Sequence, residues 1–553
     1  MRRMKANKTR STGAAFFVAL GILLSRIAGL IRERVFAHYL GNSDAAGAFK
    51  AALRIPNFLQ NLFGEGVLSA SFIPVYSRLR AEMDEETSRK MAGVVGTCLA
   101  LGVSVLVLIG ILLTPSIVDL VAPGFKGELR ELTIELVQIL FPGVGLLVIS
   151  AWCLGILNSH RKFFLSYFAP VLWNAAMIAT LLVFGGGAGQ TRLALYLAWG
   201  SVVGSALQLG IQLPFVYKYA GRVRFGVNKA DLKLPHVREV FRNLGPVFIS
   251  RGVVQISAYI DGMIASFLGA AAVSSLAYAQ TIYLLPISLF GMAVAAAELP
   301  EMSVAGGATM EAKDKLRARI QNGLRKIAFF VVPSAVGFLL LGRAVVSALY
   351  QTGQFGPEDT LFVWYVLMGS VLGLLAATWG RLYSSAFYAL GDTRTPLRFA
   401  ILRVVVTIAL GLTFAFLLRP TVAAFFATVP GLRLPSLPLI EISIGAVGLT
   451  IASSLAGCLE FALLKWKMSE RIGSTTLPVS FRLKVWGSAA LAGSLALLFD
   501  RLVLVPSNLS IRLGSYDLTP VLVLTLFGGL YGLFAIVTGI DEASHFVRKL
   551  RRR

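Results

Sequence analysis

The chain has 553 residues, of which 56% are hydrophobic and only 14% are charged. Soluble domains average roughly 25% charged residues, so this composition excludes a water-soluble enzyme of this size. Glycine and proline occur at ordinary abundance, 54 and 21 residues, which excludes a low-complexity disordered chain. We therefore predict an all-α polytopic membrane protein.

Apolar stretches separated by short loops recur along the whole chain. A membrane-spanning helix needs roughly 20 apolar residues, so the length leaves room for a dozen or more spans. We predict fourteen helices, at about residues 13–40, 45–77, 90–114, 131–157, 166–185, 192–217, 238–268, 273–300, 319–349, 359–390, 396–418, 440–464, 483–505 and 518–540.

Lysine and arginine gather in alternate loops. With a cytoplasmic N-terminus, the cytoplasmic segments hold 36 of these residues and the opposite segments hold 8. This asymmetry follows the positive-inside rule and predicts an even number of spans with both termini in the cytoplasm. We interpret the net charge of +24 as a topology signal and not as a nucleic-acid footprint. Binding to anionic lipid headgroups is the second interpretation.

Eight lysine and arginine residues fall inside predicted spans. A charge at the bilayer centre costs at least roughly 2.5–3.5 kcal/mol on insertion scales, so such residues normally face a bundle interior or a watery cavity. Arg34 and Lys50 lie near helix ends, and we interpret them as snorkelling toward the interface. For Arg403, snorkelling and lining a cavity stay equally open. The others are predicted to line a cavity, with structural ion pairing as the alternative: Arg26, Arg32, Arg54, Arg251 and Arg381.

Acidic residues accompany these cations. Glu33 and Glu65 fall in the first two predicted helices, and Asp261 falls in the seventh. Arg26 and Glu33 are seven residues apart and share a helix face, and Arg54 shares a face with Glu65 if the second helix is continuous. The pattern predicts a polar cavity with a positive bias. No spacing typical of metal ligands appears, so we expect no metal site.

Two segments resemble each other across the chain. Residues 39–74 and 267–300 both run through Leu-Gly, small residues, Pro, Leu-Phe-Gly, small residues and Pro. Six helices separate the copies, so both have the same orientation, as in transporters built from two bundles. The prolines and glycines are expected to kink or break the helices that carry them. We predict an N-lobe at 1–225, a C-lobe at 226–470, and a C-terminal helix pair with a basic tail at 471–553.

The most specific motif reads SRIAGLIRERVFAHYLG at Ser25–Gly41 and continues as FKAALRIPNFLQNLFGEGVLSASFIPVYSRL at Phe49–Leu79. Supporting motifs are GPVFISRGVVQISAYIDGMIASFLG (Gly245–Gly269), SLFGMAVAAAELPEMS (Ser288–Ser303) and FYALGDTRTPLR (Phe387–Arg398). With these motifs the chain resembles the MurJ/MviN lipid II flippases, part of the multidrug/oligosaccharidyl-lipid/polysaccharide exporter superfamily. The resemblance covers about residues 13–540.

The resemblance implies a transporter and not an enzyme. Its fold is implied to be a twelve-helix core in two lobes with an added helix pair that forms a lipid-facing groove. The implied activity is the flipping of lipid II, an undecaprenyl-pyrophosphate-linked peptidoglycan precursor, across the bacterial cytoplasmic membrane by alternating access, for cell-wall synthesis. The expected partners are this glycolipid and membrane lipids, without nucleic acid, and the protein is expected to be a monomer.

By position, Arg26, Arg32 and Arg54 match basic cavity residues of the family, and Glu33 and Glu65 match its acids. Arg381 falls at a basic position of the tenth helix. Arg251, in the seventh helix, is not typical of the family. The predicted substrate-binding residues are therefore Arg26, Arg32, Glu33, Arg54, Glu65, Arg251 and Arg381.

Some positions depart from the family pattern. Two family arginines that are thought to hold the pyrophosphate are Gln60 and Thr281 here, and we hypothesise that Arg251 replaces the charge lost at Thr281. The family's acid after the Gly41 turn is Gly47 in this chain.

Asp261 matches a carboxylate that some family members use for a sodium ion, which makes it a candidate cation site. Thr407 and Gly411 stand where the family has the polar pair of that ion site, so Asp261 has no second carboxylate. We therefore expect no cofactor and disfavour Na⁺ coupling.

Other function classes were weighed against this one. A second exporter function in the same superfamily would carry another polyprenyl-linked glycan or a drug, although a cationic drug favours acidic cavity residues. A membrane enzyme acting on lipid-linked sugars would need clustered acids with a metal, and the acidic loop Glu82–Glu86 is interpreted as a solvated linker. A degenerate, non-transporting scaffold is the remaining alternative, because of Gln60 and Thr281.

Overall fold

The computed structural model describes residues 2–544, apart from 64–67, 69–70, 83, 222–225, 227, 229–230, 232–233, 306–308, 418–420, 422–436, 505–511 and 514–515. Side chains are described over the same ranges, except those of residues 2–19, 61, 63, 245–258, 296, 300, 303–305, 437–443, 512–513 and 516. Within these ranges the chain forms two compact units, Met1–Ser274 and Ser275–Arg553, and each is described by itself.

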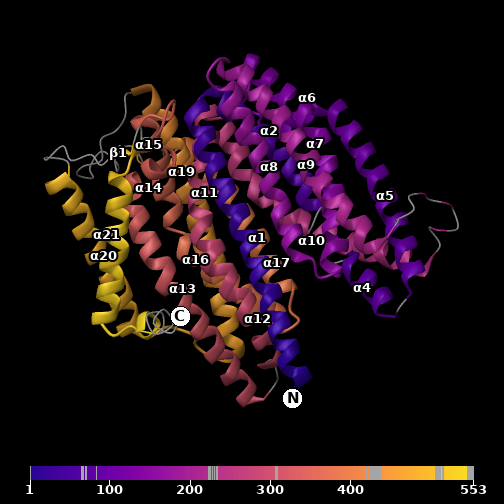
Figure 1. Cartoon of the computed structure of the whole chain (residues 1–553). Coiled ribbons are helices and arrows are strands. Elements are labelled where there is room, and N and C mark those ends of the chain that lie inside the picture. Colours follow the sequence, from indigo (N-terminus) through magenta and orange to yellow (C-terminus); the bar gives the residue numbers. More distant parts are fainter. Residues whose placement is uncertain are drawn as a thin grey trace. The chain divides into compact units, whose positions relative to one another are not determined.

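The first unit is built from helices that follow one another with short connections (Figure 1). They are α1 (Arg2–Leu40), α2 (Asp44–Phe63), α4 (Ile73–Ala81), α5 (Glu85–Leu112), α6 (Thr114–Val121), α7 (Gly127–Ser159), α8 (Phe163–Phe184), α9 (Gln190–Ala220) and α10 (Pro235–Ser266). α7 packs against α2, α5, α8 and α9, while α1 packs mainly against α8. The middle of α7 is therefore buried, and apolar residues of α5 such as Leu101, Val105 and Leu108 stay exposed, as expected of a face toward lipid.

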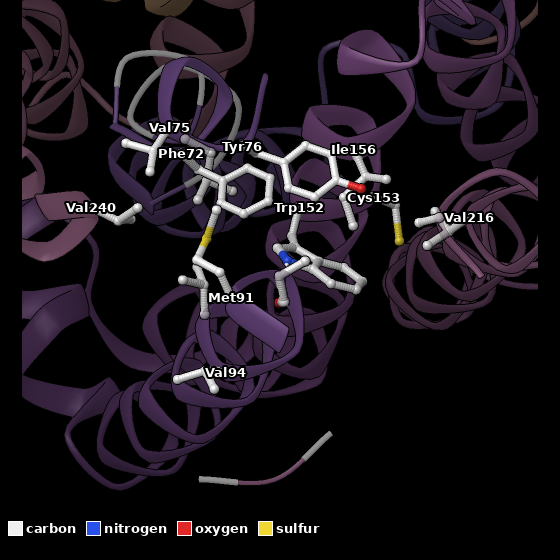
Figure 2. Close-up of a cluster of buried hydrophobic side chains, with 14 of the residues drawn as sticks. Phe72, Val75, Tyr76, Met91, Val94, Trp152, Cys153, Ile156, Val216 and Val240 are labelled. Atoms are coloured by element: carbon white, nitrogen blue, oxygen red, sulfur yellow. Dashed lines mark hydrogen bonds between the residues drawn. The ribbon is translucent and has the colours of Figure 1, made fainter. Parts of the chain in front are cut away.

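A buried hydrophobic cluster holds α4, α5, α7, α9 and α10 together (Figure 2). Trp152 on α7 is its largest member, and its indole N–H donates to the carbonyl of Ala92 at 3.2 Å. A Cβ atom at Gly96 would lie 2.9 Å from the Trp152 ring, so the absence of a side chain at Gly96 lets α5 approach the indole. Phe72 and Tyr76 stack beside it with ring centroids 5.3 Å apart.

The second unit is also helical. Its elements are α11 (Ala270–Pro286, which begins in the first unit), η2 (Ile287–Met292), α12 (Ala293–Ala305), α13 (Met310–Leu340), α14 (Gly342–Tyr350), α15 (Pro357–Val371), α16 (Leu374–Ala389), α17 (Arg394–Leu412), η3 (Thr413–Leu417), α19 (Leu437–Ile472), α20 (Val479–Phe499), η4 (Asp500–Leu504) and α21 (Thr519–Val537). Two short antiparallel strands, β1 (Arg512–Leu513) and β2 (Tyr516–Asp517), precede α21. α19 packs on α15, α16 and α17, and α20 packs on α13 and α21.

The all-α prediction is confirmed, and each predicted segment contains one helix or a broken pair. In the described part of the chain, ten helices are long and apolar enough to cross a membrane, or up to eleven if a bent pair counts as one span. The count of fourteen stays a prediction, because α1, α2 and α10 fall outside that set.

Several predicted helices are broken. The segment 45–77 is not continuous, since α2 ends at Phe63 and α4 begins at Ile73. A π-helical stretch, η2, follows Pro286, as expected where proline removes a backbone donor. α15 and α16 are bent by 45° at their junction. The prediction that the repeat's prolines and glycines interrupt helices is thus confirmed at Pro286.

The predicted lobe limits at residues 225 and 470 stay a prediction. Within the first unit, α10 packs against α2, α4, α5 and α6. Its C-terminal end approaches the loop before α7 closely, since a Cβ atom at Gly124 would overlap the backbone of Ser266 and Phe267. The backbone N–H of Gly124 donates to the Ser266 hydroxyl at 3.0 Å. Sequence patterning alone assigns α10 to a second lobe and gives no signal for these contacts.

A polar contact links the loop before α17 to the end of α19. The Asp392 carboxylate accepts hydrogen bonds from the backbone N–H and hydroxyl of Thr395, and from the Arg471 guanidinium at 2.5 Å. The Arg471 guanidinium also lies over the Phe387 ring, 5.1 Å from its centroid. Partial burial alone would raise the pKa of Asp392, but the hydrogen bonds from Thr395 and the charge of Arg471 lower it to about 2.

Stability that depends on this carboxylate is expected to change with pH. The pKa of Asp392 is lower in the folded chain than its ordinary value of 3.8, so its contribution is complete above about pH 4 and is lost as the pH falls toward 2. Asp392→Asn should lower the unfolding temperature of the purified protein at pH 5, and the difference from wild type should shrink toward pH 2. An equal difference at both pH values would show that the charge of Asp392 does not contribute.

Candidate functional site

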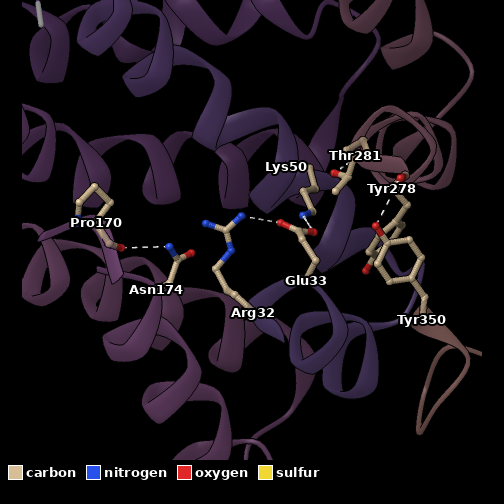
Figure 3. A network of polar contacts seen from close by, with 9 residues as sticks. Arg32, Glu33, Lys50, Pro170, Asn174, Tyr278, Thr281 and Tyr350 are labelled. Carbon is tan, nitrogen blue, oxygen red and sulfur yellow. Dashed lines mark hydrogen bonds and ion pairs between the residues drawn. The ribbon is translucent and has the colours of Figure 1, made fainter. Parts of the chain in front are cut away.

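A buried ion cluster joins α1 to α2 (Figure 3). One oxygen of Glu33 lies 2.6 Å from Nη2 of Arg32, and the other lies 2.5 Å from Nζ of Lys50. The side chains of Glu33 and Lys50 are 7% and 8% exposed, and that of Arg32 is 16% exposed. The prediction that Lys50 snorkels to an interface is therefore wrong, because Glu33 on the preceding helix offers it a buried counter-charge.

Aromatic rings cover both cations of this cluster. The Arg32 guanidinium lies 4.9 Å from the ring centroid of Trp173 on α8, and the Lys50 ammonium lies 4.3 Å from that of Phe36 on α1. Cation–π contacts of this kind gain strength when they are removed from water. The cluster is held by packing as well as by charge.

Arg54 forms a second cationic position, also on α2. A Cβ atom at Gly262 on α10 would overlap the Arg54 guanidinium, so this glycine makes the room in which the guanidinium lies. Tyr259 and Asp261 are within electrostatic range of Arg54. Phe58, one turn further along α2, packs edge-on against Tyr259 at 5.6 Å. Asp261, the candidate cation site, thus faces a cationic side chain.

Arg26 lies two turns before Glu33 on α1 and is exposed. A Cβ atom at Gly29, between these two residues, would meet nothing within 4 Å, so this face of α1 is open. Within the described residues Arg26 forms no ion pair.

In the second unit, Arg381 on α16 is exposed and lies within electrostatic range of Tyr283, Arg403 and Glu460. Arg403 on α17 pairs with Glu460 on α19 at 3.2 Å. The two alternatives given for Arg403, snorkelling and lining a cavity, did not include this ion pair. Arg381 carries the net positive charge of the group.

Two predicted site residues cannot be placed. Glu65 lies outside the described residues, and the side chain of Arg251 lies outside the described side chains, although its backbone is helical within α10. The prediction that Arg54 and Glu65 share a helix face therefore also falls outside the described residues. Thr281, at the position of a family arginine, turns its hydroxyl to the carbonyl of Ala277 at 3.0 Å.

The described part of the chain holds no group of three His, Cys, Asp or Glu side chains that could bind a metal ion. What the first unit does offer is four cations, Arg26, Arg32, Lys50 and Arg54, against the two acids Glu33 and Asp261. Cations at membrane depth are expensive and normally mark a path for an anionic ligand. Many apolar helices with such a set of cations define a polytopic membrane transporter.

Comparisons with known proteins identify the family. The lipid II flippase MurJ family matches residues 36–513 of the chain. A probable lipid II flippase MurJ of Rhizobium meliloti is 35% identical over 412 residues, which cover 72% of this chain and 74% of that protein. The lipid II flippase MurJ of Burkholderia cenocepacia is 31% identical over 390 residues, which cover 70% of this chain and 74% of that protein. The chain belongs to the lipid II flippase MurJ family.

Solved structures agree on the fold. A lipid II flippase MurJ in an inward closed conformation matches with a TM-score of 0.73 at 23% identity, covering 95% of this chain and 99% of that chain. An inward-facing multidrug resistance MATE family transporter of the MOP superfamily matches with a TM-score of 0.62 at 18% identity, covering 83% of this chain and 98% of that chain. Family and fold make this chain a transporter and a multi-pass protein of the bacterial inner membrane.

One departure from the family pattern has a structural reason. A Cβ atom at Gly47 on α2 would overlap the backbone of Ala270 at the start of α11. No side chain fits there, so the acid of the family pattern has no room in this chain. A hydrogen bond between the Ser274 hydroxyl and the Asn42 side chain lies at the same corner.

Sequence reasoning missed Lys50 and Trp173 as members of the site. A signal for Lys50 was present: Glu33 and Lys50 lie at nearly equal distances along the chain from the turn at Gly41, where φ is +56°. Two helices joined by such a turn bring these positions to similar depth. Trp173 carries no comparable signal, because α8 is distant in the sequence and uniformly apolar.

Proposed function

We propose that this chain flips lipid II across the bacterial cytoplasmic membrane by alternating access, for cell-wall synthesis. The observation that carries the proposal is the set of cations at membrane depth on α1 and α2, in a chain that belongs to the lipid II flippase MurJ family. The proposed substrate-binding residues are Arg26, Arg32, Glu33, Arg54, Glu65, Arg251 and Arg381.

The chemistry of lipid II fits these residues. Its diphosphate needs several charge-assisted hydrogen bonds, and an arginine guanidinium donates two parallel ones to a phosphate. Its polyprenyl tail needs an apolar surface. The α20 and α21 pair offers one, since large apolar side chains such as Leu491, Leu498 and Leu533 are exposed on it. Transport needs no covalent step in this scheme.

The proposal includes no resident cofactor and no sodium site at Asp261. Arg54 lies within electrostatic range of this carboxylate, and a cation so close disfavours a second one. Thr407 is buried on α17 in the second unit and brings no carboxylate to a cation site. In this proposal the membrane potential or a downhill gradient drives transport.

The orientation and partners complete the proposal. The distribution of lysine and arginine between alternate loops, 36 against 8, supports cytoplasmic termini. The partners are lipid II and membrane lipids, without nucleic acid, and the protein acts as a monomer.

Complementation tests this function. The chain is expressed in bacteria depleted of their own lipid II flippase, and growth is measured beside an Arg26→Ala variant present in equal amounts in the membrane. Growth rescue by the wild-type chain and reduced rescue by Arg26→Ala are expected. Absence of rescue by a correctly inserted wild-type chain would contradict lipid II as the substrate.

A further inference from the structure

Lys50 is a buried cation that no predicted role covers. Its ammonium lies 2.5 Å from one oxygen of Glu33 and over the ring of Phe36, and its side chain is 8% exposed. A lysine in this setting has little access to a ligand. We therefore expect Lys50 to influence ligand binding through Glu33 and not by direct contact.

Glu33 has two carboxylate oxygens, and each lies against a different cation. Arg32 donates to Oε1 and Lys50 donates to Oε2. With two cations and one carboxylate, the three side chains together carry one positive charge. If Lys50 were neutral, Glu33 would balance Arg32 alone. Carboxylates and guanidinium groups readily form two parallel hydrogen bonds, so Glu33 would then hold Arg32 more fully and leave the cluster without net charge.

Arg32 has more donors left for a ligand in the first arrangement than in the second. A guanidinium carries five N–H donors, and a single nitrogen, Nη2, donates to Glu33. The planar group lies over the Trp173 ring, a contact that engages its face and leaves donors at its edge. Arg32 is also the most exposed of the three side chains.

We propose that Lys50 is a positioning residue for substrate binding: it neutralises Glu33, and thereby leaves Arg32 free to donate to the diphosphate of the lipid substrate. The inference rests on the proposed function. In this inference Glu33 lies between two cations and separates them. The net charge of the cluster then sets the affinity for the diphosphate.

A charge-balance experiment tests this role. Full-length protein in nanodiscs is titrated with undecaprenyl pyrophosphate, and Kd is measured for wild type, Lys50→Met, Glu33→Gln and the double variant Glu33→Gln/Lys50→Met. The cluster charge is +1 in wild type, 0 in Lys50→Met and again +1 in the double variant. Lys50→Met is expected to raise Kd at least about tenfold, and the double variant is expected to return Kd to within about threefold of wild type. A loss of one charge-assisted contact corresponds to a change of this size.

Lys467→Met is the matched control. Lys467 also pairs with a glutamate, Glu470 at 2.6 Å, but this pair is exposed near the end of α19. No change in Kd is expected. Unfolding temperatures of all variants are measured in the same nanodiscs.

Each outcome decides the question. An unchanged Kd in Lys50→Met would overturn the inference. So would a double variant that is folded but still binds weakly, because Lys50 would then act directly or through packing. If Lys50→Met does not fold, the Kd of the double variant decides, since its cluster charge is again +1 and its Kd should lie within about threefold of wild type. Absence of binding by wild type would contradict the proposed function itself.

Discussion

Arg54→Ala is expected to abolish growth rescue and to weaken binding of undecaprenyl pyrophosphate by about 10- to 100-fold. Hydrogen bonds to charged groups contribute about 1.5–3 kcal/mol each, and every 1.4 kcal/mol is a factor of ten in Kd. Arg54 lies on α2, and Asp261 is within electrostatic range of its charge. Arg54→Lys keeps the charge but loses the two-pronged geometry, so it should fall between wild type and Arg54→Ala.

A substitution at Gly262 tests whether the position of the Arg54 guanidinium matters when its charge is kept. Gly262→Ala places a methyl group where the Arg54 guanidinium lies, so it displaces this group without removing it. We expect Gly262→Ala to weaken binding in the same direction as Arg54→Ala. Gly102→Ala on α5 is the control, since a Cβ atom there meets nothing within 4 Å. Full rescue by Arg54→Ala, at equal membrane levels, would remove Arg54 from the site.

Trp152→Ala is expected to give the largest loss of stability. Its indole fills the cluster shared by α4, α5, α7, α9 and α10, and truncation leaves a cavity and removes the hydrogen bond to the Ala92 carbonyl. Replacing a buried tryptophan or phenylalanine by alanine costs about 3–5 kcal/mol. The unfolding temperature of purified protein in detergent measures this loss.

Trp199→Ala provides the comparison for Trp152→Ala. Trp199 lies on α9 in the same unit but is 56% exposed, so its removal leaves no internal cavity. Its unfolding temperature should stay close to that of wild type. Equal unfolding temperatures for the two variants would show that the cluster around Trp152 does not limit stability.

Composition and apolar periodicity were sufficient to predict the helices, because a chain in a bilayer must satisfy its backbone within each helix. The breaks within the helices were harder to predict from the sequence. Pro286 marks one of them in the sequence, whereas no local pattern predicted the 45° bend between α15 and α16.

The site was predictable only in part, for a related reason. An arginine inside a span is conspicuous because its insertion is costly, so Arg32, Arg54 and Arg381 stood out in the sequence. The residues that contact these arginines did not stand out in the sequence. Whether a lysine such as Lys50 snorkels or is buried depends on what the adjacent helix offers it, and this is a property of the folded chain.

The open face of α1 at Gly29 has a practical consequence for chemical labelling. A cysteine introduced there would meet no packed atom within 4 Å, and it would lie between Arg26 and Glu33 on the helix that carries the candidate site. Of the three native cysteines, Cys153 is buried, and Cys98 and Cys458 are only partly exposed. The protein thus offers a position where a thiol-reactive dye could follow ligand occupancy and the opening of the transport path in real time.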